Sequence, residues 1–167
     1  MTAAPLKGRL SGAAAALFLL LASSKVDAAC LACTCSMSTT GLTFGAYSPL
    51  AATPADVTGS IRVQCSLLGL AALIVAYTIE LSPGNSGTFS DRTMTGTGGT
   101  LRYNLYTTPQ RTTVWGNGAN GALPLSDSYL LGLLGVTRDY TVHGRIPAGQ
   151  AVRPGTYMDS LIVTLSY

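Results

Sequence analysis

The sequence predicts an all-β fold in which two antiparallel sheets form a sandwich. After the first 28 residues, apolar and polar side chains alternate in short runs that are separated by turns rich in Gly, Pro, Asn and Ser. No run has the 3.6-residue period of an amphipathic helix. The last run, residues 155–167, extends to the end of the sequence, so we expect no later part of this chain to cover that strand.

The first 28 residues have the pattern of a secretory signal peptide. Lys7 and Arg9 form a positive start, residues 10–22 form an apolar run, and residues 26–28 offer a cleavage site. The apolar run is shorter than the ~20 residues that a membrane-spanning helix needs. We therefore expect cleavage near residues 28/29, one domain over residues 29–167, and no membrane span after the signal is removed.

The chain that remains after cleavage is nearly neutral. It carries seven Arg, no Lys and six carboxylates, which gives a net charge near +1. This balance leaves no basic patch of the kind that binds nucleic acid, so we expect no nucleic-acid partner. A surface rich in Gly, Ser and Thr, with Arg as its only cation, is typical of an extracytoplasmic structural domain.

The four cysteines fit an oxidising compartment. Cys65 ends an alternating run that points its thiol into the core, and Cys35 begins another apolar-faced run. A disulfide between them would close a loop of about 30 residues and stabilise the fold by roughly 3 to 4 kcal/mol. For Cys30 and Cys33, a structural disulfide is favoured over a redox motif or half of a zinc site, because no βαβ pattern is present and His143 is the only histidine.

Six strands are expected in the mature chain, at residues 35–44, 57–65, 74–81, 101–106, 139–146 and 155–167. In the first of them the inward-facing positions change parity at residues 39–41, which indicates a bulge where the strand changes sheets. Six strands are one fewer than the seven of an ordinary immunoglobulin-like sandwich, and the missing strand is the last. Such an incomplete sandwich leaves a groove lined by its own core, which a strand from another protein can fill.

The last strand is expected to form the wall of this groove. Its polar residues Ser160, Thr164 and Ser166 face outward, and Ile162 is the one exception to the alternation. The inward residues, which we expect to contact the donor strand, are Tyr157, Leu161, Val163, Leu165 and Tyr167.

Two patterns resemble catalytic or nucleotide-binding motifs. Residues 116–121 match the glycine spacing of a dinucleotide-binding turn, but Pro124 and more loop follow where that motif requires a helix. His143 and Asp139 are four residues apart on one strand, hence about 13 Å apart, which is too far for a direct dyad. We therefore expect no enzyme, with no catalytic residue, metal or cofactor.

Nine sequence blocks cover nearly the whole mature chain in order, at residues 35–38, 41–47, 61–65, 77–82, 92–94, 101–107, 114–118, 143–150 and 155–159. Together they resemble the spore coat protein U domain family, which includes subunits of archaic chaperone–usher pili. The departures from the family pattern are the apolar segments at residues 67–73 and 130–134, and the additional Cys30 and Cys33.

The resemblance implies an incomplete immunoglobulin-like pilin that is displayed at the cell surface. A periplasmic chaperone would insert a strand into it. At an outer-membrane usher, a strand from a neighbouring subunit would replace the chaperone strand. It also implies structural roles for five residues, with arginines bound to loop carbonyls and aromatics in the core and at sheet corners: Arg92, Tyr103, Trp115, Arg145 and Tyr157. The alternatives are a spore or cell-envelope coat protein of the same fold and a secreted carbohydrate-binding module.

The start of the mature chain predicts a position in the fibre. Only residues 29–34 precede Cys35, whereas a donor strand needs about ten residues of alternating apolar character. We therefore expect a subunit that accepts a strand without giving one, at the fibre tip.

Two segments are apolar where turns are normally polar. They contribute the leucines Leu67, Leu68, Leu70, Leu130, Leu131, Leu133 and Leu134. In an immunoglobulin-like sandwich such loops gather at one end, so we expect an exposed apolar patch that mediates surface attachment and biofilm formation. The alternative is that these leucines fold back into the core or contact a second subunit.

Overall fold

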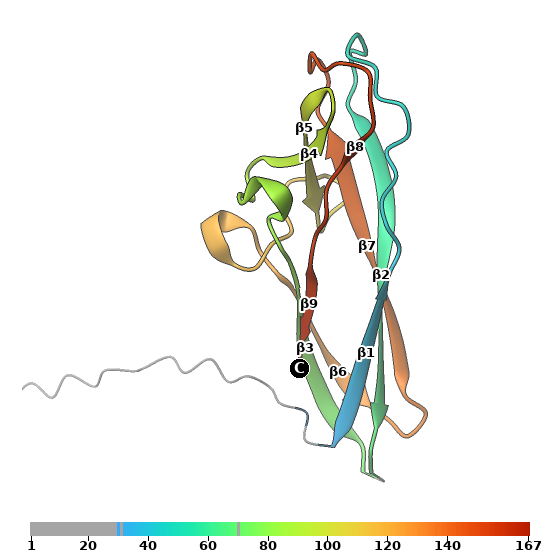
Figure 1. The fold of residues 1–167 in the computed structure, drawn as a ribbon. Helices are drawn as coiled ribbons and strands as arrows, with labels where there is room; N and C mark the ends of the chain where they lie inside the picture. Colours follow the sequence, from blue (N-terminus) through green and yellow to red (C-terminus); the bar gives the residue numbers. More distant parts are fainter. Residues whose placement is uncertain (1–29, 31, 70) are drawn as a thin grey trace, which may run out of the picture.

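The computed structural model describes residues 30, 32–69 and 71–167, so the predicted signal peptide and Leu70 lie outside the described residues. Two antiparallel sheets pack as a sandwich (Figure 1), which confirms the predicted fold class. The larger sheet has the strand order β1-β2-β7-β5-β4-β8 and the smaller sheet the order β6-β3-β9. The strands are β1 (Cys33–Thr39), β2 (Ala55–Leu67), β3 (Leu73–Leu81), β4 (Arg92–Gly96), β5 (Gly99–Tyr106), β6 (Leu125–Leu131), β7 (Val136–Ile146), β8 (Tyr157–Met158) and β9 (Val163–Ser166).

Burial follows the alternation that predicts the long strands. In β3 every second side chain from Val75 to Leu81 is buried, and in β2 the same holds from Ile61 to Cys65. The two sheets enclose Trp115, which is fully buried and whose indole N–H donates a hydrogen bond to the backbone oxygen of Ile79 at 2.9 Å. The core therefore lies between the inner faces of the sheets, as a period of two requires.

The described chain also contains two 3-10 turns, η1 (Gly84–Ser86) and η2 (Ala119–Gly121). Neither is long and apolar enough to cross a membrane, and the described residues hold no other candidate helix.

The described residues form nine strands, and the prediction of six is wrong in four places. The first strand ends at Thr39 within the larger sheet, so its expected continuation to residue 44 with a change of sheet at residues 39–41 is wrong. The strands β4 and β6 were missing from the prediction, and the last strand is divided into β8 and β9. The inward positions of the two missing strands include charged residues, Arg92 in β4 and Asp127 in β6, which interrupt the apolar alternation. In β5, Asn104 is buried although it alternates with the inward residues Tyr103 and Leu105, and its side-chain amide donates to the backbone oxygen of Phe89 at 2.8 Å.

The last segment of the chain crosses from one sheet to the other. The strand β8 pairs with β4 of the larger sheet, whereas β9 pairs with β3 of the smaller sheet. The Asp159 carboxylate fixes the crossing by accepting hydrogen bonds from the Tyr103 hydroxyl at 2.6 Å, the Asn85 N–H at 2.9 Å and the Ser160 N–H at 2.8 Å. The single strand expected over residues 155–167 is therefore divided by a corner at residues 159–162.

Candidate functional site

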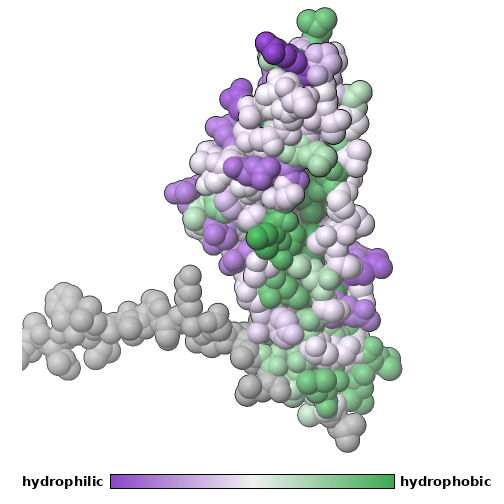
Figure 2. Space-filling model, viewed as in Figure 1, coloured by the Kyte–Doolittle hydropathy of each residue, from purple (hydrophilic) through white to green (hydrophobic). Residues whose placement is uncertain are grey.

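A groove of about 890 Å³ opens between the last segment of the chain and the segment that follows β1. Figure 1 shows these two segments, coloured red and blue to cyan, on the same side of the molecule. The floor of the groove consists of core residues from both sheets, among them Ile61, Leu81, Met94, Leu101, Tyr103 and Ile146. Figure 2 shows apolar surface in the same region, while the core residues of the floor are themselves almost fully buried.

One wall of the groove is the crossing between β8 and β9. Tyr157, Leu161 and Val163 line it, and each of these side chains is half-buried, as the alternation predicts. Leu165 and Tyr167 do not line the groove, so the expected wall is shorter than the whole last strand. Leu165 packs against the core, and Tyr167 is exposed.

The backbone of this wall has an unpaired edge. The Ser82 N–H donates to the backbone oxygen of Ile162 at 2.9 Å, so residues 162, 164 and 166 direct their backbone groups to β3. Successive residues of a strand point these groups to opposite sides. Leu161, Val163 and Leu165 therefore direct their N–H and C=O groups away from β3, toward the side where no strand of the described residues pairs with β9.

The other wall is the segment at residues 40–47, which forms no strand. Its Leu42 and Phe44 side chains cover Gly59 of β2 and Gly144 of β7, where an added Cβ would lie 3.0 Å and 2.8 Å from Leu42. The Phe44 ring also contacts the Tyr103 ring edge-to-face, with 5.9 Å between the centroids. Two residues without side chains thus create the shallow surface on which this wall rests.

The groove ends at Thr39, the last residue of β1. Cys35 lies directly opposite Cys65 in the register of β1 and β2, and the two form a disulfide with 4.1 Å between the Cα atoms. Cys30 and Cys33 form a second disulfide, and Cys33 is buried against the core. Together with Met37, these side chains pack against the hydrophobic core.

The polar groups near the groove have structural roles. Burial and the hydrogen bond to Asp159 raise the pKa of Tyr103, so its hydroxyl remains protonated and donates to that carboxylate. His143 lies on the opposite, outer face of β7, across from Thr58, because its neighbours Val142 and Gly144 face inward. What the groove presents is apolar side chains beside an unpaired backbone edge, which suits the binding of an extended peptide.

A second feature of the surface is a set of exposed apolar side chains at one end of the sandwich. The turns after β2 and after β6 both lie there, since Leu73 pairs with Leu131 and Cys65 pairs with Val136. Figure 2 shows apolar surface at this end. The exposed residues, which we call the apolar end, are Leu68, Ile74, Leu130, Leu133 and Leu134.

The apolar end differs from the predicted patch in four residues. Leu131 is fully buried at the end of β6, so its expected exposure is wrong. Leu67 belongs to β2 and is half-buried, and Leu70 lies outside the described residues. Ile74 was missed, although it is 73% exposed and pairs with Leu130 on the outer face of the smaller sheet. Its outward position in an alternating strand was the signal that could have identified it.

The residues at 18–164 match the Spore Coat Protein U domain family. The chain belongs to this family. A curated relative, Protein U of Myxococcus xanthus, is 34% identical over 133 residues, which cover 75% of this chain and 71% of the relative. The resemblance that the nine sequence blocks indicate is thereby confirmed.

A solved structure shares the fold of this family member. It is a chain in the crystal structure of the CsuC–CsuE chaperone–tip adhesion subunit pre-assembly complex, from archaic chaperone-usher Csu pili of Acinetobacter baumannii. The TM-score is 0.55 and the identity 19%, so the likeness concerns the fold alone. The match covers 81% of this chain but spans only 40% of the length of the other chain.

The roles implied by the family resemblance are mostly visible. The Arg92 guanidinium is buried and donates to the backbone oxygens of Ser82 and Trp115, as expected for an arginine bound to loop carbonyls. Arg145 differs, because it forms a two-pronged ion pair with the carboxylate of Asp56 on the outer face of the larger sheet. The implied contact of Arg145 with loop carbonyls is therefore wrong.

Proposed function

We propose that this chain is a structural subunit of a fibre assembled by the chaperone–usher route. Its groove takes a β-strand first from a periplasmic chaperone and then, at an outer-membrane usher, from a neighbouring subunit on the way to the cell surface. The observation that carries this proposal is the groove itself, which lies over core residues and beside an unpaired strand edge. The family and the shared fold support it. No residue has a catalytic role.

Charged residues in the groove wall are expected to abolish the complex with the chaperone. In Leu161→Asp/Val163→Asp, two carboxylates would face the apolar floor, and burying them costs several kcal/mol. We expect at least a hundredfold loss of affinity, measured by co-purification and size-exclusion chromatography with the periplasmic chaperone of its assembly system. The matched control is Ser160→Asp/Thr164→Asp, which places the same charges on exposed neighbours. Equal chaperone binding by both double variants would contradict the proposal.

We also propose that the subunit lies at the fibre tip and attaches the cell to apolar surfaces, promoting biofilm formation. The support is the apolar end, whose side chains include Leu68 at 70% and Leu134 at 102% exposure. Burying about 300 Å² of apolar area against a hydrophobic support stabilises the contact by roughly 7 kcal/mol before ordering costs, without a specific ligand. Exposed apolar patches on soluble domains commonly mark binding surfaces.

Removing the apolar end should abolish attachment to plastic while leaving assembly intact. The variant replaces four exposed leucines by Ser, at Leu68, Leu130, Leu133 and Leu134. The buried Leu131 is left unchanged, because its loss would destabilise the sandwich. The control is Leu50→Ser, a 96% exposed leucine outside this cluster. Adherent cells are counted on polystyrene, and fibres by electron microscopy. Full attachment by the fourfold variant, or loss of its fibres, rules the apolar end out as the adhesive.

A coat protein of the same fold is the second candidate, favoured by the 34% identity to Protein U. It is distinguished by purification from the native cell, where a coat protein would be recovered in the envelope without a bound chaperone. The carbohydrate-binding alternative gains less support. Among the exposed large hydrophobic side chains of the described chain, Tyr167 is the single aromatic.

A further inference from the structure

The groove wall at residues 40–47 is held at two ends. At its start, the Thr40 N–H donates to the backbone oxygen of Ser60 at 2.9 Å, and the Ser60 N–H donates to the Thr40 hydroxyl at 2.8 Å. At its far end, the Tyr47 hydroxyl donates to the backbone oxygen of Pro147 at 3.0 Å and accepts the Gln150 N–H at 2.9 Å. No backbone hydrogen bond joins residues 41–46 to any other described residue.

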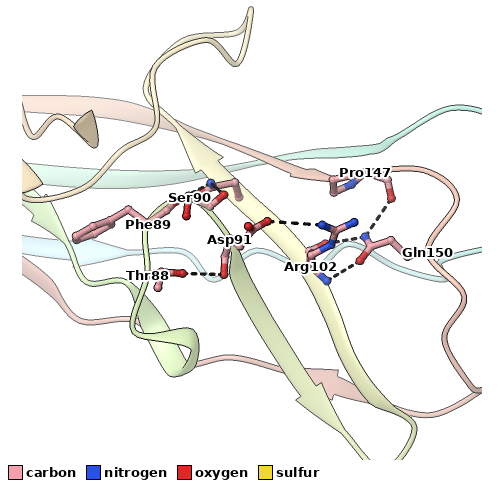
Figure 3. A network of polar contacts seen from close by, with 8 residues as sticks. Thr88, Phe89, Ser90, Asp91, Arg102, Pro147 and Gln150 are labelled. Carbon is pink, nitrogen blue, oxygen red and sulfur yellow. Dashed lines mark hydrogen bonds and ion pairs between the residues drawn. The ribbon is translucent and has the colours of Figure 1, made fainter. Parts of the chain in front are cut away.

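The anchor of the far end is itself rigid. The Gln150 side chain is buried and imitates a strand residue, since its amide oxygen accepts the Arg102 N–H at 2.8 Å and its amide nitrogen donates to the Arg102 oxygen at 2.9 Å. Figure 3 shows Gln150 between Arg102 and Pro147. Pairing of β5 thus continues beyond Ile146, where β7 ends, and the loop after β7 becomes part of the sheet.

Few interactions fix the middle of the wall at residues 40–47. Gly45 has a φ of +71°, and an added Cβ at Gly41 or Gly45 would meet no atom within 4 Å. Leu42 and Phe44 rest on glycine positions, which permit sliding along the sheet more easily than interlocked side chains do. The position of the wall therefore depends on its two ends.

We propose that Tyr47 is the positioning residue of the groove, which holds residues 42–46 at the distance where an inserted strand can pair with both walls. Paired strands lie about 4.8 Å apart, so a strand that pairs on both sides needs walls roughly 10 Å apart. A shift of 1 to 2 Å would break one of the two ladders. This inference rests on the proposed function, because it concerns the strand that the groove receives.

Removal of the Tyr47 hydroxyl tests this. The full mature chain and its Tyr47→Phe variant are refolded with a fluorescein-labelled nine-residue peptide that carries Leu or Val at alternate positions. In the variant we expect the peptide to dissociate at least tenfold faster. We also expect the amides of residues 42–46 to lose their protection from hydrogen exchange in the complex, while those of Val163 and Leu165 remain protected. The control is Tyr106→Phe, since Tyr106 lies outside the groove and its hydroxyl has no hydrogen bond within the described chain.

A second variant moves the same wall without touching the anchor. Gly45→Ala adds no steric contact but disfavours the backbone at φ +71°, so it should produce the same faster dissociation. If Tyr47→Phe fails to fold, Gly45→Ala tests whether the position of this wall controls peptide dissociation. If Tyr47→Phe equals Tyr106→Phe in the rate of peptide dissociation and in amide protection, Tyr47 does not position the groove wall. That result leaves the proposed function unaffected. A wild-type chain that does not bind the peptide overturns the proposed function, and the positioning role with it.

Discussion

A chain that carries its own donor strand after Tyr167 is expected to melt at least 20 °C above the unmodified chain. The added strand, joined by a flexible linker, would place three or four apolar side chains over the core residues that form the floor of the groove. At ~1.5 to 3 kcal/mol each, their burial contributes roughly 5 to 10 kcal/mol, which is comparable to the stability of an entire domain. Since each kcal/mol raises the Tm of a domain of this size by roughly 2 to 8 °C, a large shift follows. The measurement is thermal unfolding by circular dichroism.

The control is the same added strand with its sequence shifted by one residue. This shift turns the apolar side chains to solvent and the polar ones to the core, while composition and length stay the same. We expect its Tm to equal that of the unmodified chain, which should aggregate or unfold readily. An unmodified chain that is a stable monomer with a high Tm would show that the groove needs no donor strand.

The long strands could be predicted because one face of each meets the core. In β3 and β7 the buried side chains fall at every second position, so the local sequence contains the whole signal. The disulfide between Cys35 and Cys65 is consistent with the same reasoning, since both thiols were assigned to inward faces. Patterns of this kind need no knowledge of distant residues.

The strands β4 and β6 could not be predicted because each has a charged residue on its inner face. Arg92 is acceptable there because oxygens from residues 82, 104 and 115 surround it, and these positions are far apart in the sequence. Asp127 is acceptable because it accepts a hydrogen bond from the Tyr140 hydroxyl of β7. A single sequence does not reveal such partners, so both segments look like loops.

The extent of the groove was beyond prediction for a related reason. The wall at residues 40–47 rests on Gly59 and Gly144. These two glycines lie close together only because of the pairing register of β2 and β7. The corner in the other wall, between β8 and β9, depends on Asp159, whose hydrogen-bond partners Tyr103 and Asn85 come from other parts of the chain. Alternation alone therefore predicted a full-length wall, although only the part up to Val163 lines the groove.

Replacement of Arg92 by Met should destabilise the sandwich by about 3 to 5 kcal/mol. The guanidinium is fully buried and donates to the Asn104 side-chain oxygen at 2.7 Å, the Trp115 oxygen at 2.7 Å and the Ser82 oxygen at 2.9 Å. Burial lowers the pKa of Arg92, although the group stays charged at neutral pH. Met fills much of the same volume but leaves the backbone oxygens of Ser82 and Trp115 without donors, at ~1 to 3 kcal/mol each, while the Asn104 oxygen keeps only the Leu105 N–H. Relief of the buried charge offsets part of this cost.

The loss should reach the groove through Ser82. The Ser82 N–H donates to the Ile162 oxygen, and the Ser82 hydroxyl accepts the Ile162 N–H at 2.9 Å. Because Arg92 binds the Ser82 oxygen, it stabilises the loop that holds the groove wall between β8 and β9. Urea unfolding of the donor-complemented chain measures the stability, and hydrogen exchange at Ile162 measures the wall. The control, Arg102→Met, removes a guanidinium that is 60% exposed and should change stability by less than about 0.5 kcal/mol. If both variants unfold at the same urea concentration, the buried guanidinium does not hold these loops together.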